Sequence, residues 1–250
     1  VFLSGGLDSS IVAGLLVQTG VDVRAYTLDF GLEGIPEYPY AEQVAHWLKI
    51  PLIKVDAGPA KIRAALVPTA KALDQPFGDG VTVPLFLLAQ AASQDVSVIF
   101  NGEGGDQLFA GWTNKPLIAA SLYQTQESFS QHYLRTFHRL WGYETQIFSP
   151  EGYASIQSFN PQDWLQDALD PTFTSSLLHR LRRANLMLKG AQNIHPRATA
   201  LGWAHGLKVR SPFCDPPLAQ WTFQLSGELC LQGSCEKYIL KRAVEDWLPP

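Results

Sequence analysis

The sequence predicts an α/β fold, in which a doubly wound parallel sheet is followed by a helical C-terminal half. Strand and helix patterns alternate over the first hundred residues, an order typical of parallel strands joined by crossover helices. The run Val96–Phe100 is apolar except at Ser97, a composition expected of a parallel strand that is covered on both faces. Ligands of such sheets bind at the carboxyl ends of the strands, so a site is expected at that edge.

Each element of the first region follows from the spacing of its apolar residues. Helices are expected where apolar side chains recur at intervals of three and four residues, and strands where short apolar runs lie between turn residues. The expected strands are Val1–Leu3, Val21–Leu28, Pro51–Val55 and Val96–Phe100. The expected helices are Asp8–Gln18, which Gly20 ends, Tyr40–Lys49, Lys61–Leu73 and Pro84–Ser93.

Beyond about residue 113 the strand signals fade and prolines punctuate a helical sequence. Helices are expected over Asn114–Gly142, Thr172–Gly190, Thr199–His205 and Glu236–Trp247. No internal repeat is visible, and no obvious linker separates the two halves. We therefore expect a sheet region over residues 1–113 and a helical region over residues 114–250 that packs against it and completes the site. Because Val1 already lies in an apolar run, we also expect the chain to be part of a longer protein.

Composition and charge exclude several classes of protein. Of the 250 residues, 46% are hydrophobic and 17% are charged, which excludes intrinsic disorder. No apolar run reaches the roughly 18 residues that a membrane span requires. The net charge of −4 argues against nucleic acid as a partner. Three cysteines without a C-x-x-C motif argue against a disulfide scaffold or a zinc site, so we expect a cytoplasmic protein.

The segment Ser4–Ser10, Ser-Gly-Gly-Leu-Asp-Ser-Ser, lies between the first expected strand and the first expected helix. Its two glycines let the backbone turn tightly, and the amides at the start of the helix add partial positive charge. Such a loop suits a phosphate group, and Asp8 suits it if a magnesium ion bridges the two. The segment lacks the G-K-[ST] ending of a P-loop and the G-x-G-x-x-G of a dinucleotide site. The alternative is a plain helix start with turn glycines and an Asp or Ser cap.

A second polar loop, Asn101–Asp106, follows the fourth expected strand directly. Three glycines and two carboxylates are poor core material, but they suit a loop that crosses a bound nucleotide. Asp106 could share a metal ion with Asp8, and Glu103 could act as a general base. The alternative is a glycine-rich turn with solvated acids, which is less favoured when two such loops end neighbouring strands of one sheet.

The loops and three later segments resemble known signatures. Ser4–Ser10 resembles the pyrophosphate-binding loop of ATP pyrophosphatases, and Asn101–Trp112 resembles the G-E-G-x-D-E-L-F-x-G-Y signature of the asparagine synthase family. Asp74–Asp79, Arg210–Asp215 and Lys237–Lys241 resemble that family's D-x-P-f-x-D, R-x-P-F-L-D and K-x-i-L-R segments. The matches follow the family's order across nearly the whole chain.

The resemblance implies a synthetase domain over residues 1–250, with the adenine nucleotide alpha-hydrolase-like fold and with ATP and Mg²⁺ bound at the sheet edge. It implies that aspartate is adenylated with release of pyrophosphate, and that ammonia then displaces AMP to give asparagine. The adenosine pocket would comprise Leu3, Leu28, Asn101 and Gly102, and the pyrophosphate loop Ser4, Gly5, Gly6, Ser9 and Ser10. Asp8 and Asp106 would bind Mg²⁺, Lys237 would neutralise charge at the α-phosphate, and Glu103 would take a proton from ammonia. The acceptor side would include Asp79, Gln107 and Arg210.

Several residues depart from the family pattern on the acceptor side. Gln107 and Lys208 stand where the family usually has Glu, Trp203 stands near the usual Met, and Pro196-Arg197 is the nearest match to an Arg-Asp element. Two alternatives therefore stay open: an adenylating cyclase of the β-lactam synthetase or lasso-peptide cyclase type, and a non-catalytic nucleotide-binding module. The family's usual N-terminal glutamine-hydrolysing domain is not found in these 250 residues. We therefore expect that the chain uses free ammonia, receives it from a glutamine amidotransferase domain or subunit, or belongs to a longer protein.

Overall fold

The structure is a computed structural model that describes residues 1–31, 38–75, 79–111, 130, 133–134 and 142–249. The expected helix over Asn114–Gly142 lies almost entirely outside these residues. Among the described residues, no helix is long and apolar enough to cross a membrane.

The strands form short pairs, and the two pairs of the sheet region are parallel. β1 (Ala25–Asp29) pairs with β2 (Leu52–Asp56), and β3 (Val98–Phe100) pairs with β4 (Lys208–Arg210). The α/β class is therefore confirmed, whereas the continuous doubly wound sheet stays a prediction. A third pair, β5 (Leu231–Gln232) with β6 (Cys235–Glu236), is an antiparallel hairpin.

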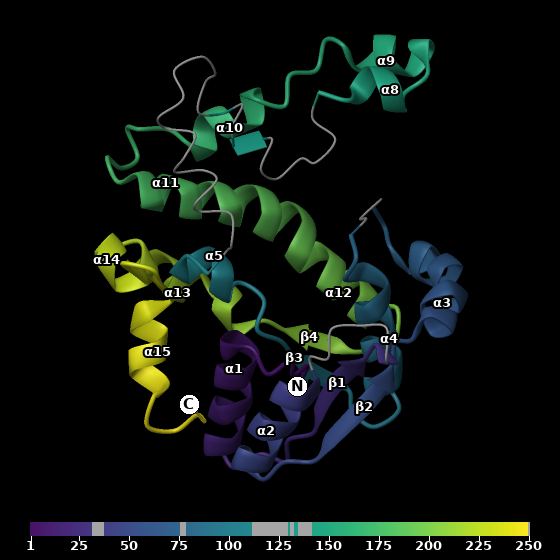
Figure 1. Ribbon diagram of the computed structural model, residues 1–250, viewed down its shortest axis with the longest axis vertical. Helices are drawn as coiled ribbons and strands as arrows, with labels where there is room; N and C mark the ends of the chain where they lie inside the picture. Colours follow the sequence, from purple (N-terminus) through teal and green to yellow (C-terminus); the bar gives the residue numbers. More distant parts are fainter. Residues whose placement is uncertain (32–37, 76–78, 112–129, 131–132, 135–141, 250) are drawn as a thin grey trace.

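Residues 1–3, expected as the first strand, lie between β1 and β3 (Figure 1). Phe2 makes one parallel bridge to Tyr26, and its backbone N donates to the carbonyl of Phe100 at 2.9 Å. The backbone N of Leu3 donates to the carbonyl of Tyr26, also at 2.9 Å. This short segment therefore connects the two parallel pairs by hydrogen bonds and places the loop that follows it at their carboxyl ends.

β4 was not expected from the sequence. It contains three residues, of which only the central Val209 is half-buried, so no alternating pattern is long enough to predict it. β4 forms because distant parts of the chain bring it beside β3, with which it pairs in parallel. The backbone N of Asn101 extends the pairing by donating to the Arg210 carbonyl at 3.0 Å.

The helices of the first region match their predictions to within about two residues, the usual uncertainty of helix ends. They are α1 (Leu7–Gln18), α2 (Tyr38–Leu48), α3 (Pro59–Ala72) and α4 (Thr82–Ala92). Ala25 belongs to a core cluster that includes residues of α1 and α2, whereas Tyr26, the next residue of β1, belongs to a second cluster with α4 and α12. Because successive side chains of a strand point to opposite faces, β1 has helices on both faces.

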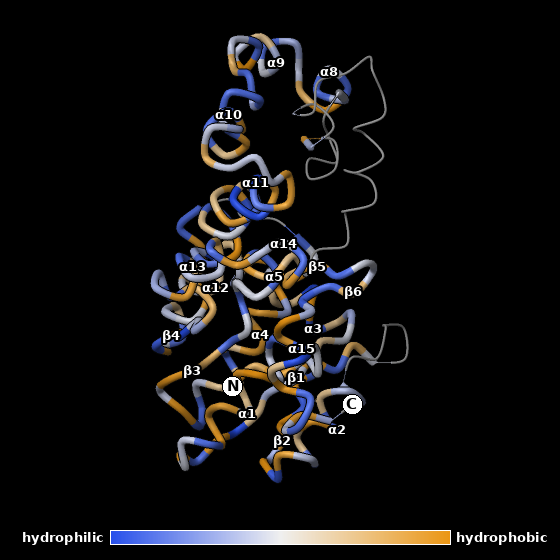
Figure 2. The backbone as a smooth tube through the Cα atoms, turned by 90° about the vertical axis from the view of Figure 1, so that its left-hand side faces the viewer, coloured by the Kyte–Doolittle hydropathy of each residue, from blue (hydrophilic) through white to orange (hydrophobic). Residues whose placement is uncertain are grey.

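α5 (Gly105–Phe109) ends the first region, and the described part of the second region is mainly helical. Its described α-helices are α8 (Glu144–Ile147), α9 (Pro150–Ile156), α10 (Asp163–Ala168), α11 (Leu177–Ala184), α12 (His195–Trp203), α13 (Pro216–Thr222), α14 (Gly227–Cys230) and α15 (Tyr238–Val244). A short 3₁₀ turn covers Pro212–Cys214. In both views α8–α10 lie at the end of the molecule farthest from α1 and the strands (Figures 1 and 2).

The two helices expected over Thr172–Gly190 and Thr199–His205 form a single helical run, because a ten-residue π-helical segment, Asn185–Ile194, joins α11 to α12. Gly190, taken from sequence as a helix end, is buried inside this run. A Cβ at Gly190 would lie 3.6 Å from Cγ of Gln107 in α5. That distance is an ordinary van der Waals contact, so the helical run passes close to α5 at this point without requiring a glycine.

Candidate functional site

A cavity of about 350 Å³ opens at the carboxyl ends of the strands. Residues 2–4 and 6–9 form one wall, and β1 and α4 contribute apolar side chains. The loop after β3 together with Lys237 closes the polar side. The residues predicted from sequence that line it are Leu3, Ser4, Gly6, Asp8, Ser9, Leu28, Asn101, Gly102, Glu103, Asp106 and Lys237. One cavity thus collects most of the predicted site from segments more than 200 residues apart.

Five predicted site residues do not line this cavity. Gly5 and Ser10 face a second cavity on the other side of the loop. Gln107 is buried beneath Gly190, and Arg210 donates to the carbonyl of Val209 at 3.0 Å. Asp79 lies at the start of α4, where its carboxylate accepts hydrogen bonds from the Val81 backbone N at 3.0 Å and the Thr82 hydroxyl at 2.9 Å. The expected acceptor residues therefore lie outside the cavity wall.

The loop before α1 is held by its own hydroxyl groups. The hydroxyls of Ser4 and Ser9 lie 3.1 Å apart, and Ser9 and Ser10 both donate to the Gly6 carbonyl, at 3.0 and 2.8 Å. No side chain caps the start of α1, so amides of its first turn remain available to an anion. Gly5 has φ +81°, and a Cβ there would collide with the backbone of Tyr40, so only glycine fits.

Two acidic residues and one lysine form the charged centre of the cavity. Nζ of Lys237 lies 2.6 Å from Oδ2 of Asp8 and 2.6 Å from Oδ1 of Asp106. Burial would lower the pKa of Lys237, but the attraction of the two carboxylates outweighs it and raises that pKa. Burial has the opposite effect on Asp8 and raises its pKa, and the positive charge of Lys237 opposes that rise.

Glycines make room for this charged centre. A Cβ at Gly105 would collide with the carboxylate of Asp8, and one at Gly111 would collide with the side chain of Lys237 and with Asp106. Lys237 itself has φ +52°, a left-handed conformation that turns the chain directly before α15. The glycines of the second polar loop are therefore needed for side-chain space as well as for turning.

The carboxylates of Asp8 and Asp106 fit a shared Mg²⁺ ion. Oδ1 of Asp8 is buried and has no hydrogen-bond partner, and both carboxylates already converge on one positive charge. Mg²⁺ is bound by one or two carboxylates together with substrate phosphates, and rarely by an all-protein cage. The described residues contain no group of three or more His, Cys, Asp or Glu side chains that could hold a metal ion alone.

Glu103 is half-buried at the edge of the cavity, and its backbone N donates to Oδ1 of Asn101 at 3.2 Å. Burial raises the pKa of Glu103 to about 7. Arg197 and Lys189 oppose this rise, whereas Asp106 and Asp79 add to it. A carboxyl group poised near neutral pH can accept a proton in a reaction, as a general base requires.

Sequence reasoning missed the importance of Arg197. Its side chain is only 4% exposed and forms an ion pair with Asp79, while its Nε has no partner. Burial alone would raise the pKa of Asp79, but Arg197 and hydrogen bonds from residues 81 and 82 lower it. The pair influences the pKa of Glu103, so it belongs to the electrostatic surroundings of the site.

Apolar lining residues were also missed. Phe2, Tyr26, Leu85 and Leu88, together with the polar Thr27, line the cavity beside the predicted Leu3 and Leu28. The signal was present in part: Leu85 and Leu88 are three residues apart on one face of α4. Because both residues are far from the two loops along the chain, the sequence did not indicate that they line the same cavity.

The family model described as asparagine synthase matches residues 1–250. The chain belongs to the asparagine synthase family. The sequence resembles this family most clearly in the loops Ser4–Ser10 and Asn101–Asp106, and both loops line the cavity.

Curated relatives from the asparagine synthase family match nearly all of the chain at modest identity. A protein of Mycobacterium tuberculosis named "Putative asparagine synthetase (glutamine-hydrolyzing)" is 27% identical over 276 residues, which cover 99% of this chain and 42% of the relative. Asparagine synthetase (glutamine-hydrolyzing) 1 of Bacillus subtilis is 23% identical, covering 99% of this chain and 44% of the relative. The asparagine synthetase (glutamine-hydrolyzing) of Triphysaria versicolor is 26% identical, covering 98% and 35%. The chain thus spans less than half the length of these relatives.

Proposed function

We propose that the chain carries out ATP-dependent amide-bond formation through an acyl-adenylate, with aspartate as the acceptor and asparagine, AMP and pyrophosphate as products. The observation that supports this most directly is a single cavity that brings three features together. They are the uncapped start of α1, the centre formed by Asp8, Asp106 and Lys237, and the half-buried Glu103. Family membership and the names of the relatives support the same reaction class.

Binding of ATP would use both sides of the cavity. The adenosine would lie against the apolar side chains of Phe2, Leu28 and Leu88, and the phosphates would lie at the loop between residues 4 and 10. Asp8 and Asp106 would hold Mg²⁺, which when bound offsets the negative charge of the phosphates. Lys237 reaches both carboxylates from the other side, so its ammonium lies where charge on the α-phosphate can be neutralised.

The reaction would then proceed in two balanced steps. An oxygen of the acceptor carboxylate attacks the α-phosphorus, and the bond to the pyrophosphate oxygen breaks. The nitrogen of ammonia next attacks the acyl carbon, AMP leaves with the bonding pair, and Glu103 takes one proton from the nitrogen. A Glu103 pKa of about 7 keeps a large fraction of the side chain in the basic form at neutral pH.

Three departures from the family pattern lie away from the cavity wall, which supports an unaltered ATP site. Gln107 is buried under Gly190, and Trp203 and Lys208 are exposed. None of these three side chains lines the cavity, and aspartate is proposed as the acceptor from family membership and the names of the relatives. A glutamine amidotransferase domain or subunit is the proposed source of ammonia, since the relatives are named as glutamine-hydrolyzing.

Acceptor-dependent exchange of pyrophosphate into ATP tests the proposal. Aspartate should support exchange, whereas other carboxylic acids in a panel should not. Asp8→Asn should abolish exchange, and Glu103→Gln should retain exchange while losing amide formation with ammonia. Exchange with another acid alone would favour the cyclase, and exchange with no acid would leave only a nucleotide-binding module.

A further inference from the structure

Two aromatic side chains meet on the surface at the end of the molecule that is farthest from the strands. Trp164, in α10, is 61% exposed, and Phe159, in the turn before α10, is half exposed. Their rings lie edge to face with centroids 4.9 Å apart. A monomer gains nothing by exposing two adjoining aromatic rings to water, so such a pair indicates a contact surface. The proposed reaction uses neither residue.

The surroundings of this aromatic pair carry charge of one sign. Asp167 follows Asp163 by four residues and Trp164 by three, so these three side chains lie on the same exposed side of α10. We call Phe159, Asp163, Trp164 and Asp167 the acidic aromatic patch. Among the described residues, neither of its carboxylates forms an ion pair with a lysine or arginine. Residues 142–170 contain five acidic residues and no lysine, arginine or histidine, which exceeds the net charge of −4 of the whole chain.

α3 presents the complementary surface. Every charged residue of α3 is basic, and Arg63 lies one turn before Val67, which is 64% exposed. Leu66 beside Val67 is also more than half exposed, whereas Ala65 packs into the core cluster that includes α4. The apolar residues Leu66 and Val67 therefore lie on the outer side of the helix. In both views α3 lies apart from α10, so within one copy of the chain the two surfaces do not meet (Figures 1 and 2).

We propose that the acidic aromatic patch of one copy of the chain docks on α3 of a second copy. The apolar side chains of the two surfaces meet at the centre of the contact, and Arg63 faces Asp163 and Asp167. Aromatic and arginine side chains of this kind contribute most to the energy of protein interfaces. Because the two surfaces differ, each copy in a pair keeps one surface free, and the copies assemble head to tail into a ring or a filament. The inference does not depend on the proposed function.

Sedimentation velocity of the full chain over a wide range of concentration tests the contact. The sedimentation coefficient of wild type should rise with concentration, and added salt should reduce the rise because it screens exposed charges. Trp164→Ala and Val67→Asp should each weaken association at least tenfold. The first removes aromatic contact area, and the second places a carboxylate opposite the acidic aromatic patch. Both side chains are exposed, so neither variant should lose its fold, which circular dichroism will check.

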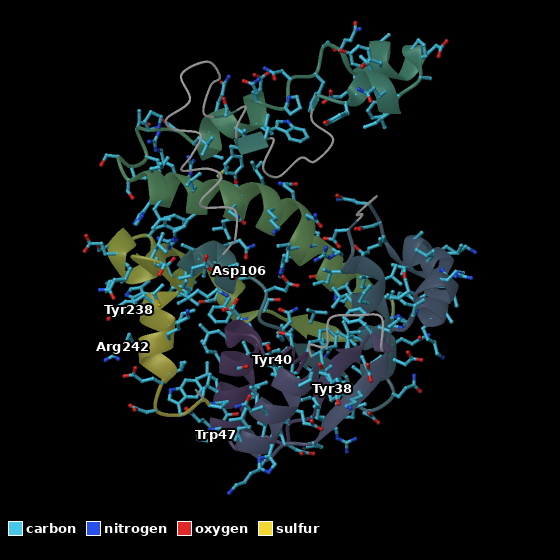
Figure 3. All side chains as sticks on the ribbon, in the orientation of Figure 1. Tyr38, Tyr40, Trp47, Asp106, Tyr238 and Arg242 are labelled. Atoms are coloured by element: carbon cyan, nitrogen blue, oxygen red, sulfur yellow. The ribbon has the colours of Figure 1, made fainter. Side chains whose placement is uncertain are left out.

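Matched controls change the same residue types elsewhere on the surface. Trp47, on α2, lies at the opposite end of the molecule from α8–α10 (Figure 3), and Val21 lies in the turn after α1. Both side chains are more than half exposed. Trp47→Ala and Val21→Asp should therefore associate within about twofold of wild type.

An equimolar mixture of Trp164→Ala and Val67→Asp separates this contact from any other mode of association. The first variant keeps α3 and the second keeps the acidic aromatic patch, so the mixture should form a two-copy complex and nothing larger. A wild-type chain that stays monomeric at every concentration, a mixture that does not associate, or equal weakening by the control variants overturns the contact. Acceptor-dependent pyrophosphate exchange tests only the proposed function, so the two proposals can fail separately.

Discussion

Replacement of Lys237 by Met should destabilise the protein strongly at neutral pH. The ammonium lies 2.6 Å from each of two carboxylates, and at an effective dielectric constant of about 20 each pair attracts by about 6 kcal/mol. Desolvation offsets much of this, and removal of one partner from a buried pair costs about 3–5 kcal/mol. Because Asp106 is 48% exposed and water can solvate it, we expect a loss near the lower value, about 3 kcal/mol.

The loss should depend on pH in a defined direction. Without Lys237 nothing opposes the burial that raises the pKa of Asp8 above 3.8, so the folded variant binds a proton that the unfolded chain has released. Its stability therefore falls as pH rises from about 4 through the raised pKa of Asp8. The difference in the free energy of unfolding between wild type and Lys237→Met should be largest at pH 8. It should become smaller below the raised pKa of Asp8.

Urea unfolding at pH 8 and pH 4.5, with and without Mg²⁺, measures the effect. Mg²⁺ should recover part of the loss in Lys237→Met, because it returns positive charge to Asp8 and Asp106. Lys71→Met provides the control for loss of a positive charge on an exposed helix. A loss below about 1 kcal/mol, the value of an exposed ion pair, or an equal loss at both pH values would refute the reasoning.

Three further predictions concern the surroundings of the charged centre. The rate of amide formation should increase as pH rises through about 7, whereas the rate of pyrophosphate exchange should not. Because the pKa of Glu103 is raised on folding, the free energy of unfolding should fall between about pH 4.5 and 7. Glu103→Gln should remove both pH dependences, as measured by pH–rate profiles and denaturation curves. Gly105→Ala should displace the carboxylate of Asp8 and weaken Mg·ATP binding at least tenfold in calorimetry, whereas Gly80→Ala, with open space around it, should bind normally. Arg197→Met should cost about 3 kcal/mol, the lower value for a buried pair, because Asp79 is 39% exposed and water can solvate it. A loss in the double variant with Asp79→Asn that is smaller than the sum of the two single losses would show the coupling, while additive losses would contradict it.

Much of the first region could be predicted because its signals are local. The helix Leu7–Gln18 follows from apolar spacing within twelve residues, and the loop before it follows from two glycines and a short strand. By contrast, β4 contains only three residues, and the π-helical segment Asn185–Ile194 carries no distinct sequence signal. Both depend on what packs against them, so local patterns could not reveal them.

The sequence by itself determined the family of the protein, the two polar loops and the identity of the charged residues in them. Only the tertiary structure decided that Lys237, 229 residues from Asp8, lies between Asp8 and Asp106, and that Gln107 is buried under Gly190 and does not line the cavity. It also decided that Arg197 pairs with Asp79, and that a second cavity lies behind the loop. The physical reason is that the residue type sets the chemistry a side chain can perform, whereas the packing of distant segments sets the distances, burial and neighbouring charges on which its pKa and its reach depend.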